Sequence, residues 1–469
     1  MIRNIFFLNV RLFLSLLISF VATGILVSNT PDSQYASFVF FSSVFSLGMS
    51  FPNSLSSVAQ KFFIEKNESY LSLILIFVVI SVVLTVTLFA VELTFFDSSS
   101  SFLHQMFIVM LFSNFLQIIN ALFIAHIFVT GDVYMLARVG VLDALIKGSF
   151  VLFYREVESA MMFWVLLIFI SNFVSFLYYF IYFKKSIPKK LIYSSNVTKE
   201  ILNFWRWFIL GSVVKNLRSN GLVFAIRMSS YGDRLLVAYG LYKQLENGTK
   251  KIGTTVNSIA RPRLIKINMN GDIIKLALIF RKVVVATLML IVIPYGVITI
   301  FVKEFLLAWI GHIPAHSIDF VRSGLLLIFT ECLFVQLMNL VYFGGSPKKF
   351  QLYGAFITFM FLFALVPIFY FDMGPLWFIW MPVIFGILGL IGRFLAVPKN
   401  QRNHSLISMV IFDIVLIFIV VFTLVYGLSY LNFVNKLVVS ATCIAGLAWF
   451  YNRDLFRINK KSIYALFNS

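Results

Sequence analysis

Long apolar stretches separated by short polar connections dominate the chain. A helix needs roughly 20 residues, at about 1.5 Å rise each, to cross the hydrocarbon core of a membrane, so stretches of that length are the unit to count. They are apolar on every side, which favours helices over the alternating strands of a membrane barrel. The pattern predicts about fourteen spans, at residues 5–28, 36–58, 70–91, 102–127, 135–154, 159–183, 201–226, 233–256, 279–302, 318–343, 350–370, 374–396, 404–427 and 431–451.

The composition also indicates a chain embedded in lipid. Of the 469 residues, 60% are apolar and 12% are charged, and the surface of a water-soluble domain needs more polar residues than that. A net charge of +19 would suggest nucleic-acid binding in a soluble protein, but such binding requires a basic patch on a water-exposed domain. The spans leave no room for one, so we expect no nucleic acid among the partners.

The two cysteines point to neither a disulfide framework nor a metal site. Cys332 and Cys443 both lie within apolar stretches. Spacings typical of cysteine ligands are absent from the sequence around them. We therefore predict no bound metal.

Loop charges predict which side of the membrane each connection faces. Lys and Arg accumulate in cytoplasmic loops. With both termini in the cytoplasm, about 22 Lys and Arg fall in the inside connections and the tail, and 4 fall in the outside connections. An odd number of spans would destroy this alternation. The sequence therefore predicts an even number of spans, with both termini cytoplasmic.

The spacing of the spans predicts two similar lobes. A basic connection with the sequence KKSIPKKLIYSSNVTKE divides the chain after six spans. A second long connection, around RPRLIKINMNGDIIK, has isoleucines among cations, and membrane-surface anchoring is favoured for it over substrate contact. The predicted organisation is an N-terminal six-helix lobe at 1–183, a cytoplasmic linker at 184–200, a C-terminal six-helix lobe at 201–396, and a helix pair with a cytoplasmic tail at 397–469. Repeated halves with a substrate path between them are common in secondary transporters.

Charged residues inside the spans are the best candidates for a substrate site. Each costs about 2.5–3.5 kcal/mol to insert, so each needs a partner, a wet cavity or a short route to the surface. Cations outnumber anions among them, and those we select for a cationic cavity are Arg11, Lys147, Lys215, Arg218 and Lys243. Such a cavity suits an anionic passenger, because Arg binds pyrophosphate oxygens bidentately and Lys binds them as a point charge. An exporter of organic cations should instead hold acidic and aromatic residues.

Four of these cations differ in how well a structural role explains them. Arg11 lies about six residues into its span, close enough to the cytoplasmic end for its side chain to reach the surface. Lys243 has Glu246 three residues further on, which allows an ion pair on one helix face. Lys215 and Arg218 share a face beside polar neighbours, and for them a water-filled lumen is the favoured interpretation.

Energy coupling by H⁺ or Na⁺ needs a group that changes charge, and no other cofactor is expected. Asp143 is the leading candidate, although Lys147 four residues later makes an intrahelical salt bridge the favoured interpretation. Glu331 has no obvious local partner, and burial in lipid would keep it neutral, as a passive residue or a proton carrier. The sequence contains no nucleotide-binding loop and no nucleophile elbow, so we expect a transporter rather than an enzyme.

Three short segments resemble one family of transporters. NSIARPRLIKINMNGD contains Pro262 followed by a Gly-Asp helix start, FLLAWIGHIPAHS contains Trp309 and Gly311 in a Leu-x-Trp-x-Gly connection, and FVTGDVYMLARVGVLDAL is similar to a polar joint between spans four and five. Together with the six-plus-six organisation, they resemble the multidrug/oligosaccharidyl-lipid/polysaccharide (MOP) exporter superfamily, and within it the Wzx-type O-antigen flippases.

The resemblance implies a MATE-like all-α fold with a central cavity that opens alternately to the two sides. Its cargo would be an oligosaccharide linked to undecaprenyl pyrophosphate, moved from the cytoplasmic to the periplasmic leaflet of a bacterial inner membrane. Membrane lipids, a polysaccharide polymerase and a chain-length regulator would be its partners. The alternatives are a MATE-like multidrug exporter and a membrane-embedded polymerase or ligase. The latter enzymes carry a large periplasmic loop, whereas the longest outside connection here has about 16 residues.

The predicted topology can be tested with single cysteines at Ser98 and Lys348, placed in a background without Cys332 and Cys443. A membrane-impermeant maleimide should label Ser98→Cys in intact spheroplasts and Lys348→Cys only after permeabilisation, because loop charge places the first outside and the second inside. The reverse pattern would invert the topology.

Overall fold

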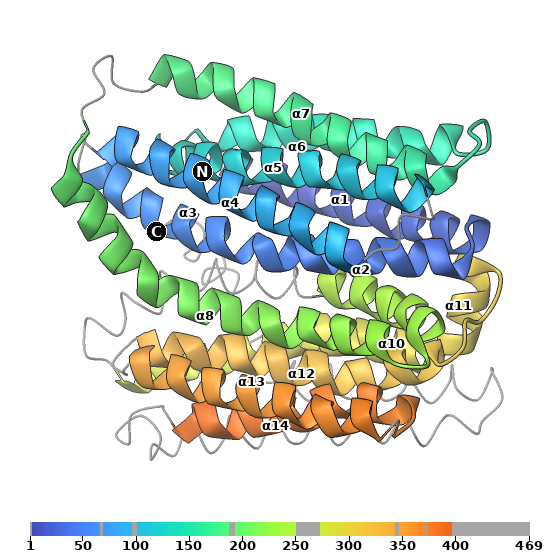
Figure 1. Cartoon of the computed structure of the whole chain (residues 1–469). Helices are drawn as coiled ribbons and strands as arrows, with labels where there is room; N and C mark the ends of the chain where they lie inside the picture. The colour runs from blue at the N-terminus through green and yellow to red at the C-terminus, as the bar shows by residue number, and fades with distance from the viewer. Residues whose placement is uncertain are drawn as a thin grey trace. The chain divides into compact units, whose positions relative to one another are not determined.

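A computed structural model describes residues 2–65, 69–95, 101–130, 132–186, 193–249, 273–342, 347–371 and 373–395 of the chain (Figure 1). Every regular element within these ranges is a helix, which confirms the all-helical prediction for this part of the chain. The last two predicted spans, 404–427 and 431–451, and most of the predicted surface-anchoring segment lie outside the described residues. The number fourteen therefore stays a prediction.

The helices follow one another with short connections. In chain order they are α1 (Ile2–Asn29), α2 (Asp32–Gly48), α3 (Ser50–Glu65), α4 (Ser69–Phe95), α5 (Ser101–Thr130), α6 (Val133–Phe153), α7 (Ala160–Ser186), α8 (Ser195–Met228), an unlabelled helical stretch at 232–249, α10 (Ile273–Ile300), α11 (Val302–Ile310), α12 (Ser317–Tyr342), α13 (Pro347–Tyr370) and α14 (Pro375–Leu395).

Six stretches of the described helices are long and apolar enough to cross a membrane. They are Asp32–Phe63, Tyr70–Ala90, Ser101–Thr130, Ala160–Ser186, Ile279–Ile300 and Pro375–Gly392, with shorter apolar stretches at Leu14–Asn29 and Leu352–Ile368. The remaining predicted spans up to residue 396 coincide with α6, α8, α12 and the helical stretch 232–249. Charged residues inside α6 and α8 lower their hydropathy.

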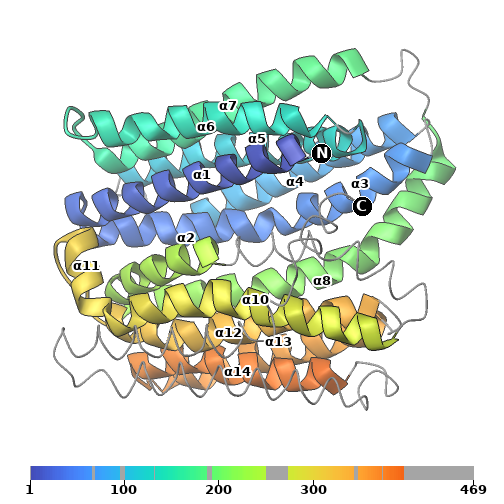
Figure 2. The same cartoon turned by 180° about the vertical axis from the view of Figure 1, so that it is seen from behind.

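The helices group into two compact units. Among the described residues beyond the first two, unit 1 comprises those within 3–241 and 358–375, and unit 2 comprises those within 242–357 and 376–395. Within unit 1, α5 packs against α3, α4 and α7, while α8 packs against α2 and α3. The helices α6 and α7 run side by side in both views (Figure 1, Figure 2).

The second predicted span is broken in the middle. We predicted one helix over 36–58, whereas α2 and α3 cover Asp32–Glu65 and are separated at Met49. Pro52 explains the break, because proline has no N–H to donate to the carbonyl of Gly48, four residues earlier. The backbone resumes at once, with the Asn53 amide donating to the Met49 carbonyl at 3.1 Å.

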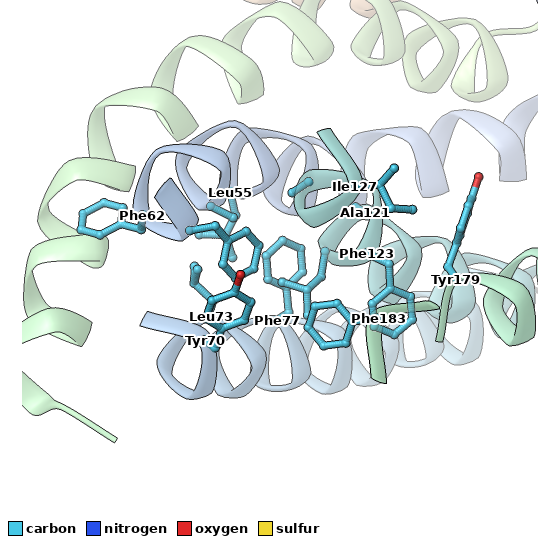
Figure 3. Packing of buried hydrophobic residues seen from close by; sticks show 14 of the residues in the cluster. Leu55, Phe62, Tyr70, Leu73, Phe77, Ala121, Phe123, Ile127, Tyr179 and Phe183 are labelled. Atoms are coloured by element: carbon cyan, nitrogen blue, oxygen red, sulfur yellow. The ribbon is translucent and has the colours of Figure 1, made fainter. Parts of the chain in front are cut away.

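The main hydrophobic cluster of unit 1 gathers the ends of six helices. Phe62, Leu73, Phe77, Phe123 and Phe183 are among its buried members, which come from the end of α3, the start of α4, the end of α5 and the end of α7 (Figure 3). The starts of α6 and α8 complete it. The α3–α4, α5–α6 and α7–α8 connections therefore lie at one end of unit 1. All three were predicted to face the cytoplasm, so we call it the basic end.

A buried histidine ties this cluster together. His126 is 1% exposed, and its Nε2 lies 2.8 Å from Ser186 Oγ while its Nδ1 lies 3.2 Å from Tyr70 Oη. Ser186 Oγ donates to the Tyr182 carbonyl at 3.0 Å, so it accepts from His126 Nε2–H, and Tyr70 O–H donates to Nδ1. One side chain thus connects α4, α5 and α7.

Unit 2 contains a short helix that the sequence pattern did not predict. The nine residues of α11 lie between α10 and α12 and contact both. Its buried residues Val302, Leu306 and Ile310 recur every four positions along one face. Gly311 ends the helix with φ 86°, a conformation that glycine adopts without strain. This turn supplies a physical reason for the glycine of the Leu-x-Trp-x-Gly segment.

Close packing in unit 2 depends on a glycine of α12. A Cβ at Gly324 would meet the ring of Tyr242 and would lie 2.8 Å from Tyr295 Oη. Tyr295 is fully buried on α10, and its hydroxyl donates to the Val321 carbonyl at 3.2 Å. Neither ring can move without disturbing the buried core.

Gly324→Ala should therefore destabilise the protein by about 1–3 kcal/mol through overpacking. Gly392→Ala is the matched control, because its Cβ would lie 3.8 Å from Tyr353 in ordinary contact. The control should be neutral or up to about 1 kcal/mol more stable, from helix propensity. Thermal unfolding of the detergent-solubilised chain measures both, and equal midpoints for the two variants would contradict the packing argument.

Candidate functional site

The seven residues selected from the sequence lie on five helical segments. Arg11 is on α1, Asp143 and Lys147 on α6, Lys215 and Arg218 on α8, Lys243 on the stretch 232–249, and Glu331 on α12. The side chains of Arg11 and Lys215 lie outside the described part of the structure. The other five can be placed, and they fall into separate groups.

Asp143 and Lys147 form the ion pair predicted from their spacing. The Lys147 ammonium lies 2.5 Å from Asp143 Oδ1, with side-chain exposures of 25% and 19%. Ser171 of α7 donates a short hydrogen bond to the same carboxylate oxygen. Both partners point to the side of α6 that packs against the bundle. The carboxylate is thus held by one cation and one hydroxyl.

Asparagines of α5 and α7 form a second polar group, which the sequence analysis did not select. Asn172 donates to Ser113 Oγ at 2.7 Å, and Asn120 donates to the Asn172 carbonyl at 3.2 Å. The amide atoms of Asn114 and the Oδ1 of Asn120 are buried without a hydrogen-bond partner in the described structure. The signal was present in the sequence, because Ser113, Asn114 and Asn120 are polar residues in the middle of a mainly apolar span.

The Asp143 site and the asparagine group both offer oxygen atoms in a membrane-spanning helix bundle. Carboxylate, hydroxyl and amide oxygens are the ligands that hard cations prefer. A buried polar atom without a partner costs about 1–3 kcal/mol, so its persistence asks for an explanation such as a water or an ion. No group of three His, Cys, Asp or Glu side chains with metal-ligand geometry occurs among the described residues.

The polar stretch of α8 divides between two faces. Asn216 Nδ2 donates to Ser50 Oγ at 2.5 Å, and Ser212 Oγ donates to the Ser50 carbonyl at 3.1 Å. One helical turn is 3.6 residues, so residues 216 and 218 differ by about 200° around the helix. Arg218 therefore lies on the side of α8 opposite the seam with α3.

Because Asn216 faces α3, the lumen-lining interpretation of α8 now applies to Arg218 and not to Asn216. Asn216 joins two helices, as does Trp205, whose Nε1 donates to Ser54 Oγ at 2.8 Å. The contact between α3 and α8 begins just after the break at Met49, where Ser50 and Ser54 accept hydrogen bonds from α8. Of the residues with described side chains, Arg218 is left as the cation on the other face, partly exposed.

Lys243 and Glu246 form the second ion pair. The Lys243 ammonium lies 2.5 Å from Glu246 Oε2, and the Glu246 side chain is fully buried while Lys243 is 22% exposed. Lys243 also lies 5.8 Å from the ring centre of Tyr242. The structure therefore contains the Lys243–Glu246 ion pair that the sequence analysis gave as the alternative to a lumen role for Lys243. The Lys243 ammonium is thus partly exposed, whereas the carboxylate that it contacts is buried.

Glu331 lies on α12 with a partly buried side chain, and the residue takes part in an interaction. Its role in coupling stays a prediction.

Comparisons with known proteins agree on the fold. No protein-family model and no curated protein sequence matches the chain. Among solved structures, the chain is similar to "Lipid II flippase MurJ, inward closed conformation", with TM-score 0.69 and 14% identity over 97% of this chain and 100% of that one. It is also similar to a multidrug resistance MATE family transporter of the MOP superfamily in its inward-facing form, with TM-score 0.60 and 14% identity over 84% of this chain and 96% of that one.

The outward-facing form of a transporter with the same description matches with TM-score 0.60 and 16% identity, over 86% of this chain and 96% of that one. These identities are low, so the likeness concerns the fold. The chain has the polytopic all-helical fold of these transporters, as the MATE-like prediction stated. No substrate follows from the likeness itself.

The Asp143–Lys147 pair can be tested through stability. Lys147→Met should lower stability by up to about 3 kcal/mol, since it leaves a carboxylate in the bundle with Ser171 alone. The double variant Asp143→Asn/Lys147→Met should recover much of that loss, because it removes the charge as well. Thermal unfolding in detergent gives the comparison.

The matched control is the pair of Arg227 and Asp233, which joins α8 to the following helix and has side-chain exposures of 29% and 39%. Arg227→Met should cost about 0–1 kcal/mol, as expected for a solvent-exposed pair. A double variant at residues 143 and 147 that is no more stable than Lys147→Met would show that the two side chains do not compensate one another.

Proposed function

We propose that this chain, which has the fold of MOP-superfamily transporters, moves a lipid-linked oligosaccharide across the membrane by alternating access. The cargo proposed is an O-antigen repeat unit on undecaprenyl pyrophosphate, carried from the cytoplasmic to the periplasmic leaflet. The chain would work in the inner membrane of a bacterium, with both termini in the cytoplasm. It would supply a polysaccharide polymerase and its chain-length regulator.

The observation that carries this proposal is the excess of cations inside the spans. Arg218 and Lys243 are partly exposed, Lys215 lies three residues before Arg218 in the same predicted span, and Arg11 lies in the first predicted span. Lys243 has Glu246 as a partner, and cations outnumber anions in the three predicted spans that hold these residues, which suits an anionic ligand. A pyrophosphate group supplies several anionic oxygens at once.

The comparisons support a lipidic cargo. The flippase structure covers 97% of this chain with TM-score 0.69, against 84% and 0.60 for the inward-facing MATE transporter. That flippase acts on lipid II, as its description says. A passenger that is half lipid and half polar needs a path that is open to the bilayer on one side and wet on the other.

Alternating access requires two bodies that move relative to one another. We propose that units 1 and 2 are these bodies, and that they correspond to the two six-helix lobes predicted at 1–183 and 201–396. Their boundaries differ because unit 1 also contains 201–241 and 358–375.

We propose Asp143 as the site of H⁺ or Na⁺ coupling, with Glu331 as a second candidate. The Lys147 ammonium lies 2.5 Å from Asp143, where a coupling cation would bind. Lysine and cation would therefore compete for one carboxylate. Binding of the ion would release Lys147 from Asp143, which adds a cation to the set available for an anionic cargo.

The second candidate is a MATE-like exporter of organic compounds, supported by the matches to MATE transporters. It predicts acidic and aromatic residues around the cargo. Glu246 is the acidic residue that contacts the cavity candidate Lys243, but its side chain is fully buried. The geometry therefore favours the anionic cargo.

The test is a flipping assay in vesicles that contain the purified chain and a polyprenyl-pyrophosphate-linked oligosaccharide. A lectin added outside reports how fast the sugar from the inner leaflet becomes accessible. Arg218→Gln should slow this exchange at least about tenfold, equivalent to about 1.4 kcal/mol. Lys243→Gln/Glu246→Gln should do the same without leaving a lone buried carboxylate.

Lys303→Gln is the control, because Lys303 is exposed on the short helix α11. It should flip the cargo at the rate of the unmodified protein. If the cavity variants also flip at that rate, the anionic-cargo proposal fails. Transport of a cationic dye by the unmodified chain, with no flipping of the lipid, would establish the exporter instead.

A further inference from the structure

The helix α6 carries charges on two opposite faces. Asp143 and Lys147 point into the bundle, whereas Arg138 is exposed on the other side. At about 100° per residue, Arg138 shares its face with Val141 and Leu145, which are 39% and 67% exposed. These exposed apolar residues face lipid in a membrane bundle. Arg138 is therefore a cation on the lipid-facing surface, and the proposed transport path does not use it.

Arg138 is held by aromatic side chains. Its guanidinium carbon lies 4.3 Å from the ring centre of Tyr134, one turn earlier on α6. It also hydrogen-bonds to the hydroxyls of Tyr134 and of Tyr178 on α7. Within the described residues, the groups that act on this guanidinium are these two tyrosines, and no carboxylate is among them. Among the described residues, the two tyrosines therefore hold the Arg138 guanidinium in place without neutralising its positive charge.

The site lies near the basic end of unit 1. Arg138 is in the second turn of α6, just after the connection from α5. On α7, Tyr178, Tyr182 and Lys185 are spaced by four and three residues, so they share one face. Tyr182 Oη lies 3.1 Å from Thr130 Oγ1 at the end of α5, and Lys185 is exposed in the last turn of α7.

Such an arrangement matches the level of lipid headgroups. Tyrosines concentrate where hydrocarbon meets the polar interface, and basic residues at that depth attract anionic lipids. Deeper along α6, Leu145 is exposed and would contact the acyl chains. An arginine offers paired N–H groups to two phosphate oxygens, and a tyrosine that accepts from arginine still has its own O–H to donate.

We propose that Arg138, Tyr134 and Tyr178 bind the phosphate of an anionic phospholipid headgroup on the outer surface of α6 and α7. Arg138 donates to the phosphate oxygens, Tyr178 donates a further hydrogen bond, and Lys185 adds attraction for net negative charge. The acyl chains lie along the exposed apolar residues of the two helices. This site holds a lipid of the surrounding leaflet, independently of the transported cargo.

The other end of α6 supplies a matched comparison. Arg155 is also an exposed arginine beside a tyrosine, with its Nε donating to Tyr154 Oη at 3.0 Å. Two exposed acids, Glu156 and Glu158, follow directly in the chain. Their negative charges repel an anionic headgroup. Arg155 therefore has the same arginine–tyrosine pairing as Arg138, but in acidic surroundings that disfavour an anionic lipid.

Native mass spectrometry of the purified full-length chain tests the proposal. Titration with phosphatidylglycerol should show one tight lipid that is bound at least about fivefold more weakly by Arg138→Gln, the factor expected for one basic group near an anionic surface. Tyr178→Phe should weaken the same lipid, and Arg138→Lys should weaken it less than Arg138→Gln. Arg155→Gln should behave as the unmodified chain. Equal melting temperatures will show that each variant is folded.

Two further arms identify the ligand. Phosphatidylcholine, which has the same phosphate but no net charge, should bind more weakly than phosphatidylglycerol. Millimolar inorganic phosphate should leave the bound lipid in place. The proposal is overturned if Arg138→Gln binds phosphatidylglycerol as the unmodified chain does, if Arg155→Gln loses it equally, if the two lipids bind alike, or if inorganic phosphate displaces the lipid.

Discussion

A polar side chain inside a membrane must find its partner within the protein, because the hydrocarbon core contains no water to replace it. This constraint organises unit 1. Asp143 has Lys147 on its own helix and Ser171 on the next. Asn216 reaches Ser50 at the break between α2 and α3. In each case the partner determines which helix faces which, in a bundle where apolar contact with lipid and with protein differ little in free energy.

The same constraint separates the charges into two classes. Those at the ends of helices, such as Lys184 and Lys185, are exposed, and the charge rule predicts that they orient the chain in the membrane. Those inside the helices are paired or partly buried, as Lys243 is with Glu246. A net charge of +19 thus has two physical origins. Only the second class bears on the proposed cargo, and it is small enough to test residue by residue.

Local patterns in the sequence were sufficient for the helices and for pairs within a helix. Hydrophobic length predicted where the described helices lie, with ends that differ by as much as seven residues, as at Glu65 of α3 against the predicted 58. Spacing predicted the pairs at residues 143 and 147 and at 243 and 246. Partners from other helices could not be predicted, since Asn216 and Ser50 are 166 residues apart. Two shorter features were also missed. The break at Met49 depends on one proline, and the nine residues of α11 are too few to register as a span.

The two-faced helix α6 restricts how the protein can move. If α6 turned by half a revolution about its axis, Arg138 would enter the packed interior, and Asp143 and Lys147 would face hydrocarbon. Both changes separate charges from their partners, at several kcal/mol each. The helix is thereby fixed in rotation against α7, which holds Asp143 through Ser171 on one side and Arg138 through Tyr178 on the other. Any motion of this part of the chain must carry α6 and α7 together as one rigid pair, by tilting or sliding, with neither helix rolling on its neighbour.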